Sequence, residues 1–248
     1  MTDTVTAVAH RGNPYLFREN TLDSLRSALL RGADAVETDV RLTRDGVPVL
    51  LHDGTLKRLW GLDRPLRSLS ADEVRDRTDG GVPTLAEALA ATAGHRLMLD
   101  LPGEPDVRTA RRIVDVVRES GAADRVYYCA GARAMLSVRA ADPDAEIALT
   151  WTTLAPPRPA LLDAVRPRWL NYRFGLVDRA LAERVHAGGH LLSVWTPDTR
   201  RSMRRLIALG VDSITTNRID TLHALTRPDR SARRRPALRP DRRPAPRP

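Results

Sequence analysis

The sequence predicts an α/β protein of the (β/α)8, or TIM-barrel, class. Three observations lead to this expectation: the length of 248 residues, eight short apolar runs, and an amphipathic stretch after each run. Eight βα units in about 225 residues match the count and length of one barrel. A doubly wound open sheet remains an alternative, because pattern alone does not show closure.

The eight candidate strands are short, often β-branched and bounded by turn-forming or charged residues, which is typical of buried parallel strands. They are Val5–Ala9, Ala35–Leu42, Arg96–Leu101, Val126–Ala130, Glu146–Trp151, Trp169–Arg173, Leu191–Trp195 and Ser213–Thr216. The stretches between them have helical periodicity. The leucines of TLDSLRSALLRG share one face and Gly32 ends that helix. Thr84 and Glu87 have the spacing of a capping box.

The unit after the second strand is irregular. Residues 43–83 contain two short apolar runs and a turn, which we interpret as an insertion on the face of the barrel where the strands end. We expect a barrel domain over residues 1–226, followed by a tail over residues 227–248.

Most of the basic charge lies in that tail. The whole chain carries a formal net charge of +9. Residues 227–248 contain nine arginines, two aspartates and six prolines, so they carry +7 and leave +2 for the barrel. This composition predicts a disordered segment. We expect it to show weak attraction to anionic surfaces but no specific nucleic-acid binding, because it lacks aromatic side chains for stacking on bases.

Cys129 is the only cysteine, which excludes an internal disulfide and any multi-cysteine metal site. The sequence contains no run of about 18 apolar residues, so it predicts no transmembrane helix. The N-terminus lacks the basic and apolar regions of a signal peptide. The predicted location is therefore cytoplasmic.

Three carboxylates stand near the ends of predicted strands. Glu37 and Asp39 are two residues apart and so share a face of the second strand, and Asp100 nearly ends the third. Unpaired carboxylates are costly in a buried strand, but three of them suit one hard divalent cation. The plain alternatives are arginine partners for Glu37 and Asp39, and a helix N-cap role for Asp100.

Two histidines and an arginine lie at similar positions. His10 and Arg11 end the first strand, and His52 ends the first run of the insertion. Histidines flanking a cation suit acid–base work near neutral pH, and a guanidinium suits a phosphate oxygen. Together these residues predict phosphoester chemistry. Core packing is the alternative for each histidine taken alone, and for Trp195 at the end of the seventh strand.

The segment AHRGNPYLFRENT, followed by GADAVETDVRLTRDGVPVLLHDGTLKR, resembles the glycerophosphodiester phosphodiesterase family of the PLC-like phosphodiesterase superfamily. The closing segment SVWTPDTRRSMRRLIALGVDSITTNRID resembles the end of the same family. The resemblance covers roughly residues 5–222. It implies a TIM barrel with one divalent cation, Mg2+ or Ca2+, that belongs to lipid and glycerol metabolism. The implied reaction hydrolyses glycerophosphodiesters to an alcohol and glycerol 3-phosphate.

The resemblance also assigns roles to individual residues. They are the catalytic His10 and His52, the metal-binding Glu37 and Asp39, and the substrate-binding Arg11, Glu19 and Trp195. The histidines act as acid and base in either order, Glu19 orients Arg11 or a catalytic group, and Trp195 packs against the alcohol.

Several residues depart from the family pattern. Asp100, the expected third metal ligand, replaces a Glu, Pro102 replaces a Lys near the phosphate, and Asn217 replaces an Asp. Arg96 or Arg173 could substitute for the missing cation. The Glu, Asp, Asp set also resembles sphingomyelinase D relatives, so a phospholipase acting on lysophospholipids is an alternative. A catalytically degenerate barrel that only binds phosphodiesters is another.

Overall fold

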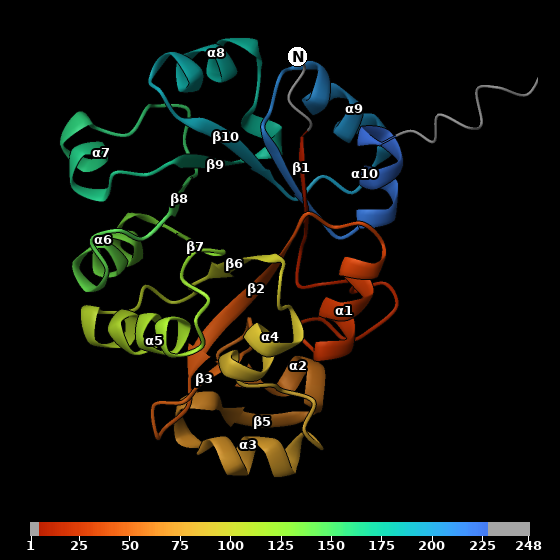
Figure 1. Ribbon diagram of the computed structural model, residues 1–248, viewed down its shortest axis with the longest axis vertical. Helices are drawn as coiled ribbons and strands as arrows, with labels where there is room; N and C mark the ends of the chain where they lie inside the picture. Colours follow the sequence, from red (N-terminus) through yellow and green to blue (C-terminus); the bar gives the residue numbers. More distant parts are fainter. Residues whose placement is uncertain (1–4, 228–248) are drawn as a thin grey trace, which may run out of the picture.

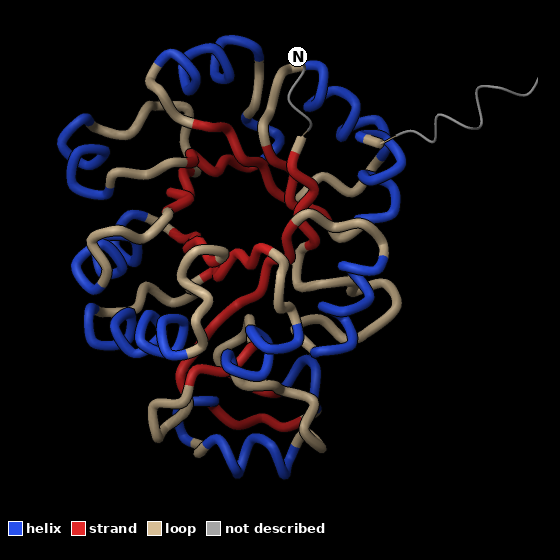
Figure 2. The backbone as a smooth tube through the Cα atoms, viewed as in Figure 1, coloured by secondary structure: helices blue, strands red, loops and turns tan. Residues whose placement is uncertain are grey.

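The computed structural model describes residues 5–227 and shows a closed ring of parallel strands surrounded by helices (Figure 1, Figure 2). The barrel strands are β1 (Thr6–Ala9), β2 (Ala35–Leu42), β6 (Arg96–Asp100), β7 (Val126–Ala130), β8 (Ile147–Trp151), β9 (Trp169–Arg173), β10 (Leu191–Trp195) and β11 (Ser213–Thr216). They pair in the order β1-β11-β10-β9-β8-β7-β6-β2, and β1 also pairs with β2. This closure confirms the TIM barrel and excludes the open sheet.

Helices follow the barrel strands along the chain and form the outer layer (Figure 2). They are α1 (Leu22–Leu30), α4 (Leu85–Ala91), α5 (Val107–Glu119), α6 (Ala132–Ala141), α7 (Pro159–Val165), α8 (Arg179–Ala187), α9 (Arg200–Ala208) and α10 (Ile219–Thr226), with a short 3-10 turn, η2 (Phe174–Leu176), before α8. The predicted capping box is present: the Thr84 hydroxyl accepts from Glu87 N, and the Glu87 carboxylate accepts from Thr84 N. This reciprocal pair fixes where α4 begins.

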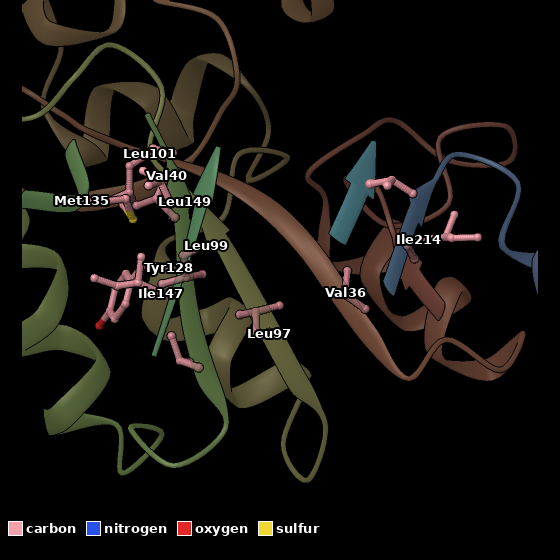
Figure 3. Packing of buried hydrophobic residues seen from close by; sticks show 14 of the residues in the cluster. Val36, Val40, Leu97, Leu99, Leu101, Tyr128, Met135, Ile147, Leu149 and Ile214 are labelled. Atoms are coloured by element: carbon pink, nitrogen blue, oxygen red, sulfur yellow. The ribbon is translucent and has the colours of Figure 1, made fainter. Parts of the chain in front are cut away.

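Alternation along the strands separates the core from the site. In β2 and β6, residues such as Val36, Val40 and Leu97 belong to the large apolar cluster shared with the helices (Figure 3). The intervening positions, Glu37 and Asp39 among them, face the inside of the ring and line a cavity there. The rest of the barrel interior, away from the strand ends that carry Glu37 and Asp39, is filled by a second apolar cluster. The barrel is therefore packed at its base and polar where the strands end.

The predicted insertion is present between β2 and α4. It comprises β3 (Pro48–Leu50), β4 (Thr55–Leu56), α2 (Lys57–Trp60), β5 (Leu62–Pro65), η1 (Leu66–Ser68) and α3 (Ala71–Arg77). Strand β3 pairs antiparallel with the end of β2, where Val40 lies opposite Leu50. The insertion has its own apolar cluster, which includes Leu56, Leu66 and Leu69. The insertion thus begins at the end of the barrel where the strands terminate.

Residues 228–248 lie outside the described part of the chain, so the predicted disorder of the tail stays a prediction. Within residues 5–227, none of the helices has the length and apolar character that crossing a membrane requires.

Candidate active site

The three predicted metal ligands meet at the end of two neighbouring strands. Asp39 on β2 lies in register with Asp100 on β6, and Glu37 lies one inward-facing position earlier. One ligand oxygen from each of the three residues lies within 4.8 Å of the others. The helix-cap alternative for Asp100 is wrong, because Asp106 caps α5 by accepting from Thr109 N.

Burial and nearby negative charge raise the pKa values of two of the three carboxyl groups. Burial, reinforced by the charges of Asp39 and Asp100, raises the pKa of Glu37 well above its usual value. Burial and the charge of Asp39 raise the pKa of Asp100 to about 7. An oxygen-only donor set with crowded negative charge fits a hard divalent cation, which would relieve both penalties.

His10 is held by an amide whose own orientation is fixed. Its Nδ1 lies 2.8 Å from Asn217 Oδ1, while Asn217 Nδ2 donates to Asp198 Oδ2 at 2.7 Å. The amide oxygen is therefore the atom that faces His10, so Nδ1 carries the proton and Nε2 is left as the basic nitrogen. His10 Nε2 lies 3.9 Å from Glu37 Oε2. Burial, followed by the charge of Arg11, lowers the pKa of His10.

Arg11 occupies a tightly specified turn after β1. The next residue, Gly12, has φ +85°, and a Cβ there would lie 2.4 Å from Ser24 Oγ, so a side chain would clash. Arg11 N donates to Glu37 Oε2 at 2.8 Å. Its guanidinium contacts Glu19 Oε1 at 2.9 Å and Asp39 Oδ2 at 3.1 Å. The predicted orientation of Arg11 by Glu19 matches this geometry.

His52 is joined to Glu19 through a chain of charged contacts from the insertion. His52 Nδ1 lies 2.7 Å from Asp53 Oδ1, and Arg58 Nε donates to Asp53 Oδ2 at 2.6 Å. The same guanidinium donates to both Glu19 oxygens, at 2.6 and 3.1 Å. The hydrogen bond from Arg58, with that of His52, lowers the pKa of Asp53 to about 2. One ionic network thus connects His52 to Arg11.

A cavity of about 240 Å³ is lined by all the predicted site residues except Glu19. They are His10, Arg11, Glu37, Asp39, His52, Asp100 and Trp195. Its inner wall adds Asn171 and Thr215, whose Oδ1 and Oγ1 have no hydrogen-bond partner among the described residues, and the same holds for Trp195 Nε1. Three residues that line the cavity thus carry buried polar atoms without a partner, which is uncommon in folded proteins.

The structure distinguishes between the two arginines, Arg96 and Arg173, that were considered as substitutes for the family's lysine at position 102. Arg96 is ruled out, because it begins β6, at the other end of the strand from Asp100, and pairs with Glu146 at 2.7 Å. Arg173 ends β9, in register with Trp195, and is exposed. A third cation, Arg41, lines a neighbouring cavity together with Pro102 and Gly103: its Nε donates to the His52 carbonyl at 2.8 Å, and its Nη1 would lie 3.1 Å from a Cβ on Gly103.

Sequence reasoning missed Asp198, Arg41 and Arg58 as members of the site. For Arg41 a signal was available, because positions 37, 39 and 41 alternate onto one face of β2. For Arg58 and Asp198 no local pattern pointed to the site, since both reach it from connections that the fold brings close.

The barrel and the cluster at its strand ends define a hydrolase of the barrel phosphodiesterase class. A family model described as the Glycerophosphoryl diester phosphodiesterase family matches residues 10–221. The chain belongs to this family.

Similar proteins agree with this assignment. The relative named "Probable glycerophosphodiester phosphodiesterase 2" of Mycobacterium tuberculosis is 30% identical over 246 residues, covering 87% of this chain and 88% of the relative. Mouse "Glycerophosphodiester phosphodiesterase 1" is 37% identical over 122 residues, but the match spans only 44% of this chain and 37% of that protein.

Solved structures share the fold. The glycerophosphodiester phosphodiesterase of Thermotoga maritima has a TM-score of 0.76 at 23% identity, covering 89% of this chain and 98% of its own. An Oleispira antarctica phosphodiesterase, solved in complex with the product sn-glycerol-3-phosphate, has a TM-score of 0.77 at 24% identity, covering 88% and 94%.

Proposed function

We propose that the chain hydrolyses glycerophosphodiesters to an alcohol and glycerol 3-phosphate, with a divalent cation held by Glu37, Asp39 and Asp100. The observation that carries this proposal is the convergence of two histidines and Arg11 on that carboxylate cluster in one cavity. Family membership and the product found in the Oleispira antarctica structure support the choice of substrate.

Mg2+ or Ca2+ bound there would bind phosphate oxygens and neutralise charge that develops on them. Arg11 holds a phosphate oxygen through its guanidinium, which Glu19 orients. Trp195 packs against the alcohol substituent at the cavity wall. Arg41 contributes the positive charge that Pro102 cannot supply, because its guanidinium lies next to Gly103.

The environments of the two histidines differ in a way that separates their roles. His10 has a lowered pKa and a neutral amide on Nδ1, so its Nε2 is free to take a proton from the attacking hydroxyl. The carboxylate of Asp53 holds the ring of His52 through Nδ1. His10 is therefore assigned as the base, which leaves His52 as the acid that protonates the leaving alkoxide.

The attacking hydroxyl belongs to water or to the substrate's own glycerol. If the glycerol 2-hydroxyl attacks the phosphorus, the alcohol leaves first and a cyclic phosphate forms, favoured by proximity. Water then opens the ring. In both cases one proton leaves the nucleophile and one reaches the alkoxide, so the histidines exchange protonation states.

The test is turnover of glycerophosphocholine, with and without EDTA, by the wild type and by His10→Ala, His52→Ala and His95→Ala. His95 is exposed and lies before β6, away from the cavity, so its variant is the matched control. We expect His10→Ala and His52→Ala to lose at least about 100-fold in kcat, and EDTA to abolish turnover. Undiminished activity of His10→Ala would overturn the mechanism.

A further inference from the structure

The loop between β1 and α1 exposes three consecutive large apolar side chains. Tyr15, Leu16 and Phe17, called the apolar tip below, are 61%, 57% and 41% exposed. Single exposed apolar residues are common on protein surfaces, but a contiguous set marks an interaction surface.

Hydrogen bonds hold the backbone of the apolar tip in this exposed position. Leu16 N and Phe17 N both donate to the Asn13 carbonyl at 3.1 Å, and Asn13 N donates to Ser24 Oγ at 2.7 Å. Further along the loop, Asn20 N donates to the Arg11 carbonyl at 3.1 Å. These hydrogen bonds join the two ends of the loop to each other and to α1, and the three side chains between them point outward.

The apolar tip lies next to the candidate active site. Its loop runs from Arg11 to Glu19, both of which take part in the site. Tyr15 and Leu16 line a surface cavity together with Asn217, the residue that binds His10. In Figure 1 this connection is the red segment between β1 and α1, at the edge of the strand ring. A surface that docks here lies close to the mouth of the site.

Arginines flank the apolar tip on both sides. The Arg18 guanidinium lies 4.0 Å from the centre of the Trp60 ring, and that of Arg218 lies 4.9 Å from the centre of the Tyr15 ring. Arg218 is also 3.7 Å from Asp220. Within residues 5–227, Arg18 and Arg31 form no ion pair with a carboxylate. Arg31 lines the same cavity as Leu16.

We propose that the apolar tip and Arg18 dock on an anionic lipid surface and bring the site to lipid-borne phosphodiesters. Aromatic and leucine side chains enter the boundary between headgroups and acyl chains, and neighbouring arginines contact the anionic headgroups. A second copy of this chain fits less well, because symmetric pairing would bring two arginine-flanked patches together and add no negative charge to either of them. The proposal goes beyond the reaction, and binding is measured without turnover.

The test compares full-length proteins, which all carry residues 228–248, so a difference between them reports the apolar tip. The disruptive variant is Leu16→Ser/Phe17→Ser, and the matched control is Leu30→Ser, because Leu30 is 89% exposed at the end of α1. Binding is measured by flotation with phosphatidylcholine vesicles, and with vesicles containing equal parts of phosphatidylglycerol, at low salt and at about 0.5 M NaCl. A second variant, Leu16→Trp, keeps the apolar character and reports insertion by lipid-dependent fluorescence.

We expect the wild type and Leu30→Ser to bind the anionic vesicles alike, and Leu16→Ser/Phe17→Ser to bind at least about tenfold less at both salt concentrations. Leu16→Trp should retain binding and shift its emission to the blue. Equal binding by the disruptive variant and the wild type would overturn the proposal. An equal loss of vesicle binding in Leu30→Ser would also overturn it. The same holds if the wild type self-associates and the disruptive variant loses this self-association but still binds vesicles. Failure to hydrolyse glycerophosphocholine would refute the proposed function and leave this binding result standing.

Discussion

Replacing Asp100 by Asn should make the metal-free protein more stable while destroying its metal site. Burial and the charge of Asp39 raise the pKa of Asp100 from 3.8 to about 7. The folded metal-free protein therefore binds this proton more tightly than the unfolded chain does. Its stability falls as the pH rises from about 4 to about 7, and the loss is complete above pH 7. Asn resembles the protonated carboxyl and cannot ionise, so Asp100→Asn avoids this loss.

The size of the effect follows from the two pKa values. Their difference corresponds to about 4 kcal/mol, since one pKa unit is worth about 1.4 kcal/mol. In EDTA at pH 8, Asp100→Asn should raise the free energy of unfolding by up to about 4 kcal/mol. At pH 5 the gain should shrink to below about 2 kcal/mol, because much of the wild-type penalty has not yet developed.

Urea unfolding in EDTA at pH 5 and pH 8 measures both quantities. Asp106→Asn is the matched control, because this exposed residue caps α5 and Asn is an equally good N-cap. It should show no gain at pH 8. Addition of Mg2+ or Ca2+ should stabilise the wild type through preferential binding to the folded state, and should stabilise Asp100→Asn much less. If Asp100→Asn instead lowered the stability of the metal-free protein at pH 8, the reasoning about charge crowding would be refuted.

Substitutions at three further residues test the groups around the histidines. Arg58→Leu should lower kcat about tenfold to 100-fold with little change in KM. Arg58→Lys should lower kcat less, because it keeps a cation next to Asp53. Equal losses of kcat for both variants in steady-state kinetics would contradict a role of Arg58 through Asp53. Asn217→Asp should move the acid limb of the pH–rate profile upward, because a carboxylate 2.8 Å from Nδ1 raises the pKa of His10; an unmoved limb would count against His10 as the base. Arg41→Met should raise KM by about tenfold, and an unchanged KM would remove Arg41 from phosphate binding.

Local sequence was enough to predict the barrel and the groups that its strands carry. Strand period and length place Glu37 and Asp39 on one face without any tertiary information. The position of Asp100 relative to them then depends only on β6 being the neighbour of β2, which chain order in a barrel supplies. The site could thus be predicted wherever its residues belong to regular strands.

The rest depends on how irregular segments fold back. Arg58 lies in a one-turn helix of the insertion, 39 positions from Glu19, and the insertion folds back along the end of β2 through β3. Asp198 reaches Asn217 from the loop after β10. Neither segment has a periodicity that sets its direction, so a single sequence leaves these contacts undetermined.

The charges around the cavity explain why arginines alone do not complete the site. Three guanidiniums stand against five carboxylates, which leaves two negative charges if all of them ionise. These are Arg11, Arg41 and Arg58 against Glu19, Glu37, Asp39, Asp53 and Asp100. Arg11 and Arg58 are already bonded to carboxylates. Without a cation, Glu37 and Asp100 have raised pKa values, and once they ionise an incoming phosphodiester meets net repulsion. One divalent cation balances the excess, so we expect substrate affinity, and not only turnover, to depend on the metal.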